Sequence, residues 1–141
     1  MSLAHSLQRS ARRRLTCLAI MLLLIPLGLI CRFLPIGLPP LIVKYGGSFL
    51  WAATVYWFIA FFLARQRPFA LALIALASTT AIEFLKRVQS PTLDGIRETI
   101  LGKVILGRFF SCTDIAIYWL AIFCVLWMDH SANYSRHASK E

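Results

Sequence analysis

Acidic residues are scarce in this sequence, and charged residues of either sign make up only 15% of it. The 141 residues include six Asp or Glu and 15 Lys or Arg, whereas 59% are hydrophobic; the mean hydropathy is +0.71. A soluble domain of this length cannot bury so many apolar side chains, because small folds leave a large share of their surface exposed. The composition therefore excludes an ordinary soluble domain and predicts a protein whose apolar surface is covered by lipid.

The usual metal-site and hydrolase motifs are also missing. There is no C-x-x-C pair, no H-E-x-x-H motif and no serine in a nucleophile elbow. Most cysteines fall in apolar runs, where a free cysteine behaves as a small hydrophobic residue, and the histidines lie near the two ends of the chain. We therefore expect no metal site, no cofactor and no catalytic residue of a known class.

No polar segment is long enough to form a water-facing domain. The formal charge of +9 would otherwise favour nucleic-acid binding, but a basic binding surface needs such a domain to display it. The basic residues instead lie next to the ends of apolar runs, which is typical of transmembrane helices. The sequence predicts a lipid bilayer, and no nucleic acid, as partner.

Four long uncharged runs are present. A helix needs about 20 mostly apolar residues to cross the hydrocarbon, and the third and fourth runs approach this length only by including Glu83 and Asp114. We predict an all-α, polytopic membrane protein with about four transmembrane helices. The runs cover residues 15–31, 45–64, 68–82 and 115–128.

The basic segment before the first run resembles the start of a secretory signal or of an organellar transit peptide. The run is longer than a usual signal core, however, and no small-x-small cleavage site follows it. A lipoprotein-type site at Cys31 is disfavoured because Ile30 occupies the place of a small residue. We expect an uncleaved first span, with the transit peptide as an open alternative.

These runs divide the chain into three parts. We expect a basic tail at 1–14, one transmembrane domain at 15–128 with a polar connection at 86–111, and a polar tail at 129–141. With four spans, the side that holds the two termini has eight Lys or Arg and the opposite side has seven. The basic run before the first helix usually dominates orientation, so both termini are expected in the cytoplasm.

Individual residues predict the roles of single helices. Ser48 is expected to cap the second helix, whose aromatic residues on all sides favour exposure to lipid. Ala70, Ala77 and Ala81 share one face of the third helix, and small residues allow close helix packing in lipid. The third helix is therefore expected at the centre of the bundle.

The polar connection is predicted to contain one short amphipathic helix, which lies in the membrane interface between the third and fourth spans. Pro91 interrupts the third helix, Thr92 or Asp94 is a candidate cap, and the new helix is expected to run to about Leu106. Its apolar side chains cluster on one side and its charged side chains on the other.

Polar side chains are expected to converge where this connection meets the helix ends that carry Glu83 and Asp114. The structural interpretation pairs Glu83 with Lys86 or Arg87 and places Asp114 in a capping box with Ser111. The functional interpretation is a site for an anionic headgroup, in which acids orient cations or carry a proton. The candidate residues are Glu83, Lys86, Arg87, Gln89, Asp94, Arg97, Arg108 and Asp114.

A set of short motifs runs through this segment and the chain before it: E-F at 83–84, P-x-L-D-x-I-R at 91–97, T-x-L-G at 99–102, L-G at 106–107, F-S-x-x-D at 110–114, R-F-L-P at 32–35, K-Y at 44–45 and L-W at 50–51. With these motifs the chain resembles a family of small bacterial inner-membrane proteins, domain of unknown function 2809, over about residues 20–128. Three positions depart from the pattern of that family, with Lys86 in place of glutamine, Cys112 in place of tryptophan and Ser48 in place of aspartate. A glutamate and an aspartate on either side of a polar loop are also distantly similar to VanZ-like proteins.

This resemblance implies a bacterial inner-membrane location without supplying a reaction. Our leading hypothesis is that the protein binds or handles an anionic phospholipid or a polyprenyl phosphate, with Arg97 as the first contact. One alternative is a membrane-embedded enzyme with Glu83 or Asp114 as general base. Another is a non-catalytic subunit that packs against a membrane protein partner through the small residues of the third helix.

Overall fold

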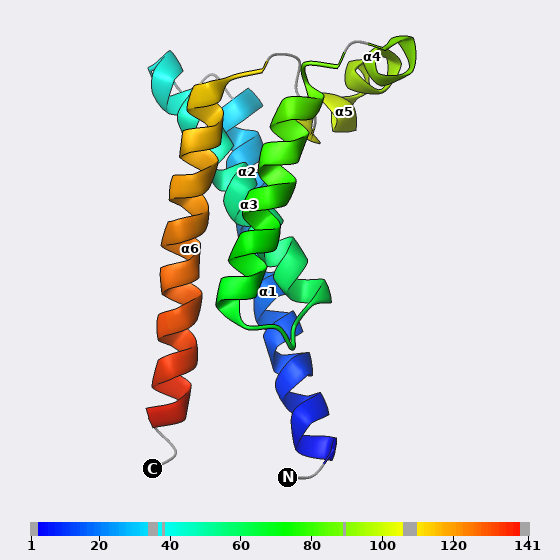
Figure 1. The fold of residues 1–141 in the computed structure, drawn as a ribbon. Helices are drawn as coiled ribbons and strands as arrows, with labels where there is room; N and C mark the ends of the chain where they lie inside the picture. The colour runs from blue at the N-terminus through cyan, green and yellow to red at the C-terminus, as the bar shows by residue number, and fades with distance from the viewer. Residues whose placement is uncertain (1–2, 34–36, 38, 89, 106–109, 139–141) are drawn as a thin grey trace.

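Every regular element in the described part of the chain is a helix (Figure 1). The computed structural model describes residues 3–33, 37, 39–88, 90–105 and 110–138, of which 3–6, 32–33, 103–105 and 133–138 are described by their backbone alone. Four helices are long and apolar enough to cross a membrane, so the prediction of an all-α, multi-pass membrane protein is confirmed. The helices are α1 Leu3–Phe33, α2 Pro40–Phe62, α3 Pro68–Leu85, α4 Pro91–Glu98, α5 Ile100–Ile105 and α6 Cys112–Ala138.

Three helices begin at a proline. Pro40, Pro68 and Pro91 occupy the first turn of α2, α3 and α4, where the missing N–H costs nothing and the fixed φ favours helix. As a result α2 begins about two turns earlier than expected, and Ser48 lies inside it. The prediction that Ser48 caps this helix is therefore wrong.

Both terminal helices extend beyond the apolar runs. Helix α1 already begins at Leu3 and carries the arginine run, whereas α6 continues to Ala138. Most of the two segments expected as tails is thus helical. The two ends of the chain lie at the same end of the bundle (Figure 1), as four crossings require.

The connection after α3 forms two short helices, so the prediction of one helix to about Leu106 is wrong. Thr99 adopts an extended conformation with ψ of 155° and ends α4. Its hydroxyl accepts the Gly102 N–H at 3.0 Å and starts α5. A Cβ on Gly102 would lie 1.8 Å from the Ile96 carbonyl oxygen, so only glycine allows α5 to fold back this closely on α4.

Helix α2 lies at the centre of the bundle and packs against α1, α3 and α6. Its buried residues include Ala52, Ala53 and Ala60, whose small side chains allow neighbouring helices to approach. The prediction of a central α3 is wrong. The exposure expected for the aromatic residues of α2 is found at Phe58 and Phe62, whereas Tyr56 and Trp57 are buried. On α3, Ala77 and Ala81 are exposed, because it buries the opposite face.

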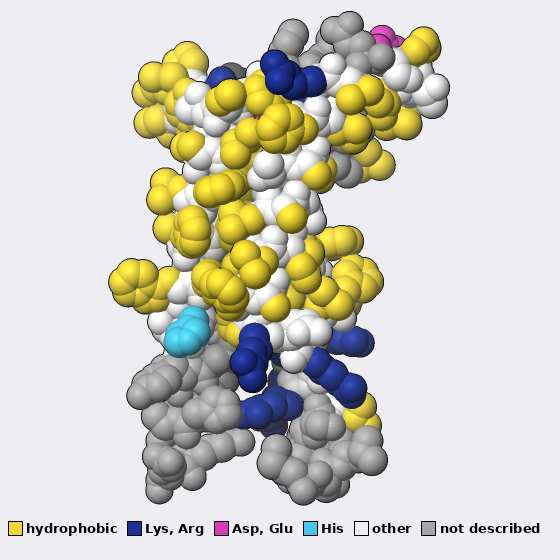
Figure 2. All heavy atoms as spheres, in the orientation of Figure 1, with side chains coloured by type: hydrophobic (Ala, Val, Ile, Leu, Met, Phe, Trp, Pro, Cys, Tyr) yellow, Lys and Arg dark blue, Asp and Glu magenta, His cyan; other side chains and the backbone are white. Residues whose placement is uncertain are grey.

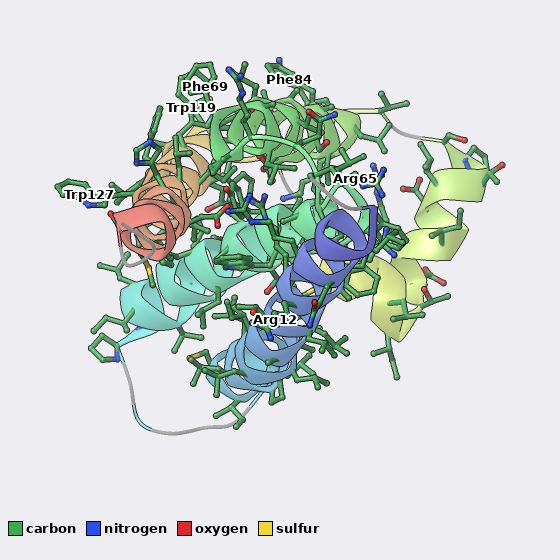
Figure 3. The ribbon with its side chains drawn as sticks, turned by 90° about the horizontal axis from the view of Figure 1, so that it is seen from below. Arg12, Arg65, Phe69, Phe84, Trp119 and Trp127 are labelled. Atoms are coloured by element: carbon green, nitrogen blue, oxygen red, sulfur yellow. The ribbon has the colours of Figure 1, made fainter. Side chains whose placement is uncertain are left out.

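The surface has the polarity of a membrane-spanning bundle. On the face drawn in Figure 2, apolar side chains cover the middle of the bundle, and Lys or Arg side chains lie at both ends. Seen from the end that holds the termini, Phe69, Trp119 and Trp127 point outward from α3 and α6 (Figure 3). Because these large aromatic side chains are exposed, lipid is the natural solvent for this surface.

The topology predicts that Gln66 and Asp94 lie on opposite sides of the membrane, because α3 separates them. Single cysteines at these exposed positions, in a cysteine-free variant, are expected to react with a membrane-impermeant maleimide from opposite sides of sealed vesicles. Labelling of both positions from one side would contradict the four-span topology.

Candidate functional site

Two groups of interacting polar side chains lie inside the bundle, one near each end. The Glu83 cluster comprises Ser48, Glu83, Lys86, Ser111, Asp114 and Tyr118. The Asp129 cluster comprises Arg13, Tyr56 and Asp129. The first contains three of the residues proposed from the sequence, whereas the second contains none.

Glu83 is the most enclosed acid of the Glu83 cluster, with 0% of its surface exposed. Its Oε1 accepts the backbone N–H of Ser111 at 2.8 Å, and its Oε2 accepts the Tyr118 hydroxyl at 3.0 Å. Oε2 also accepts a hydrogen bond from Lys86, which forms an ion pair with it. The predicted pairing with Lys86 is confirmed, and the same carboxylate joins the end of α3 to the start of α6.

The capping box predicted for α6 is only half formed. The Ser111 hydroxyl accepts the Asp114 N–H at 3.3 Å, as such a box requires. The Ser111 N–H, however, donates to Glu83 instead of to Asp114. Asp114 is only 8% exposed, and its carboxylate turns to α2, where Oδ1 accepts the Ser48 hydroxyl at 3.5 Å.

Arg97 connects α4 to the end of α3. Its guanidinium is 6% exposed and donates to Asp94 Oδ1 at 2.9 Å, to the Leu85 carbonyl at 2.9 Å and to the Val88 carbonyl at 3.1 Å. A helix end leaves such carbonyl groups without partners, and a basic side chain can satisfy them. Arg97 thus holds the connection against the bundle.

Arg87 differs from Lys86 and Arg97 because it is exposed. Its guanidinium lies over the Phe110 ring, 4.8 Å from the centroid, rather than on Glu83. Gln89 and Arg108, which the sequence also proposed, lie outside the described residues.

Sequence reasoning missed Ser48 and Tyr118 as members of this site. Tyr118 lies one helical turn after Asp114, and this i,i+4 spacing on one face was the available signal. Ser48 carried no such signal, because its partner lies 66 positions away on another helix.

The Asp129 cluster was also missed, because its acid lies at the end of the fourth apolar run and was assigned to the terminal tail. Asp129 Oδ2 pairs with Arg13 at 2.7 Å and accepts the Tyr56 hydroxyl at 2.8 Å. Arg13 also donates to the carbonyls of Ala64 and Gln66 at 3.2 and 2.9 Å. This cluster joins α1, α2, α6 and the turn after α2.

The two clusters differ in what they offer chemically. The side chains of the Asp129 cluster bind each other and backbone carbonyls, so this cluster holds neighbouring helices together. The Glu83 cluster combines two carboxylates, one amine and three hydroxyl groups from three helices. Among the described residues no group of three or more His, Cys, Asp or Glu could hold a metal ion. The carboxylates, amine and hydroxyl groups of the Glu83 cluster make it the candidate site for a polar ligand.

Replacing Asp129 with asparagine is expected to lower the free energy of unfolding by about 2 kcal/mol, because it leaves the Arg13 charge unpaired. The measurement is chemical unfolding of the purified protein in detergent. Arg12→Ala is the control, since Arg12 is exposed on the same helix and its loss should change stability by less than about 0.5 kcal/mol. Equal effects of the two substitutions would contradict a structural role for the cluster.

Tyr118→Phe tests the Glu83 cluster with a minimal change. The lost hydroxyl donates to a buried carboxylate, so we expect a destabilisation of about 1.5 kcal/mol in the same unfolding measurement. Tyr45→Phe, which removes a hydroxyl from a half-buried position on α2, should be nearly neutral. A neutral Tyr118→Phe would mean that Glu83 does not depend on this donor.

A comparison with known families gives a match to the central part of the chain. A family model described as a protein of unknown function (DUF2809) matches residues 37–122. This range contains all six residues of the Glu83 cluster and Tyr56 of the Asp129 cluster, whereas Arg13 and Asp129 lie outside it. The likeness to VanZ-like proteins stays a prediction.

No solved structure matches the fold of this chain. The family model, by contrast, covers more than half of its length and extends from the start of α2 into α6. The chain therefore belongs to the DUF2809 family of proteins of unknown function.

Proposed function

We propose that this integral membrane protein binds the anionic headgroup of a lipid at the end of the bundle that holds the Glu83 cluster. The ligand class is a phosphate-bearing amphiphile, such as an anionic phospholipid or a polyprenyl phosphate. The observation that carries the proposal is the state of Arg87, an exposed cation at the end of a membrane-spanning helix.

Arg87 is available to a ligand in a way that the neighbouring cations are not. Lys86 is bound to Glu83, and Arg97 donates to Asp94 and to two carbonyls. Arg87 forms no ion pair with a described acid, and its guanidinium lies close enough to the Phe110 ring for a cation–π contact. A guanidinium held in this way can present its N–H groups to two phosphate oxygens at once.

The surface around Arg87 suits a lipid. Phe84 and Val88, on the same stretch of chain, are 51% and 50% exposed. Apolar side chains beside a free cation match the boundary between acyl chains and headgroups. The proposal therefore gives the contact role to Arg87 and makes Arg97 and Lys86 the residues that hold the site together.

We further propose that the protein lies in the bacterial inner membrane with both termini in the cytoplasm. The end of the bundle with the termini carries the arginine run of α1 together with Arg65 and Arg67, and such basic segments favour the cytoplasmic side. In the labelling experiment, position 66 should then react from the cytoplasmic side. The headgroup site would face the periplasmic side.

Arg87→Gln is expected to reduce the affinity for phosphatidylglycerol about fivefold, because one cation near an anionic surface contributes about 1 kcal/mol. The affinity is measured by native mass spectrometry in detergent, with phosphatidylcholine of the same acyl chains as reference. Arg87→Lys should fall between wild type and Arg87→Gln, since it keeps the charge but loses the planar fork.

Arg65→Gln separates a site from general electrostatic attraction. Arg65 is an exposed arginine in the turn between α2 and α3, at the other end of the bundle (Figure 3). If Arg87→Gln and Arg65→Gln weaken phosphatidylglycerol binding equally, the proposal fails. It also fails if Arg87→Gln binds like the wild type.

A further inference from the structure

The carboxylate of Asp114 has fewer partners than its burial requires. An ionised carboxylate can accept about four hydrogen bonds, and Asp114 accepts one at 3.5 Å from Ser48. Among the described residues no cation pairs with it. Its expected partner, the Ser111 N–H, is bound to Glu83, so the fold itself makes this carboxylate available.

The charge of the Glu83 cluster is also unbalanced. Its two carboxylates and one ammonium leave a formal charge of −1, and Lys86 pairs with Glu83 rather than with Asp114. Asp114 is only 8% exposed, and a largely buried carboxylate without a paired cation is unfavourable. A cationic partner for Asp114 would remove this imbalance.

The surface of α2 next to Ser48 is bare. A Cβ built on Gly46 or on Gly47 would meet no heavy atom within 4 Å. The positions that these two Cβ atoms would occupy are therefore open, and no side chain of Gly46 or Gly47 fills the surface of α2 just before Ser48. Ser48 itself is only partly exposed.

We propose that Asp114 and Ser48 form a binding site for a small cationic group, either the primary ammonium of a lipid headgroup or a free monovalent cation. The carboxylate supplies the charge, and the Ser48 oxygen supplies a further acceptor. This site goes beyond the anionic headgroup site at Arg87, since it uses other residues and a ligand group of opposite charge.

Two lipids that differ only in the methylation of their amine test whether the cationic group is the ammonium of a lipid headgroup. Phosphatidylethanolamine and phosphatidylcholine carry the same phosphate and the same charge, but only the former donates N–H hydrogen bonds. If a headgroup ammonium occupies the site, the wild-type protein should prefer phosphatidylethanolamine about tenfold in native mass spectrometry, because a charge-assisted hydrogen bond is at stake.

A comparison of salts tests whether the cationic group is a free monovalent cation. Ammonium or sodium chloride is compared with choline chloride at equal ionic strength, with the unfolding temperature of the detergent-solubilised protein as readout. A free cation raises the unfolding temperature by binding only the folded protein, whereas the bulky choline ion should not. Whether the ligand is a lipid ammonium or a free cation, Asp114→Asn is expected to abolish the preference for phosphatidylethanolamine or for the small cation.

Matched variants keep the test decisive. Glu98→Gln removes an exposed acid of α4 and should leave the selectivity unchanged. If Asp114→Asn does not fold, Ser48→Ala carries the test, with Thr54→Ala on the same helix as its control because that hydroxyl bonds to the Leu50 carbonyl. Absence of selectivity in both experiments, or wild-type selectivity in folded Asp114→Asn or Ser48→Ala protein, would overturn this inference.

Discussion

A carboxylate inside a membrane bundle has to find its hydrogen-bond donors within the protein, because hydrocarbon offers none. Glu83 is fully buried and meets this requirement with an amine of its own chain segment, a tyrosine of α6 and the N–H group that begins α6. The position of the α6 start relative to α3 thus depends on one acid. The other features of this end of the bundle follow from that contact.

The most direct consequence concerns Asp114. In an isolated helix its carboxylate would return to the Ser111 N–H and complete a capping box. Glu83 occupies that donor, so Asp114 reaches across to α2 and ends with a single long hydrogen bond. A contact that stabilises the fold therefore leaves a second acid available at membrane depth, beside an amphipathic connection that Arg97 holds in place.

The opposite end of the bundle uses the same principle, since its buried acid also finds its donors within the protein. Arg13 reaches Asp129 and two carbonyls, and Tyr56 donates to the same carboxylate. The two clusters bind α2 to its neighbours at both ends of the bundle. In the stretch of α2 between the clusters, small residues such as Ala52, Ala53 and Ala60 allow close contact with the neighbouring helices. Among the described residues, this difference in pairing makes the Glu83 end of the bundle, with Asp114 and the exposed Arg87, the candidate for ligand binding.

The sequence by itself determined the class of the protein, the number of spans and the membrane end at which Glu83 and Asp114 meet, because hydrocarbon thickness and chain reversal leave few choices. It also indicated the pairing of Glu83 with Lys86, which is local.

Tertiary structure decided which helix is central, which face of α3 is buried, and that Ser48 and Tyr118 join the acids. A helical pattern identifies small or polar residues on one face but does not tell which neighbour that face meets. In a lipid-covered bundle nearly every face is apolar, so this choice depends on contacts between residues far apart in the chain.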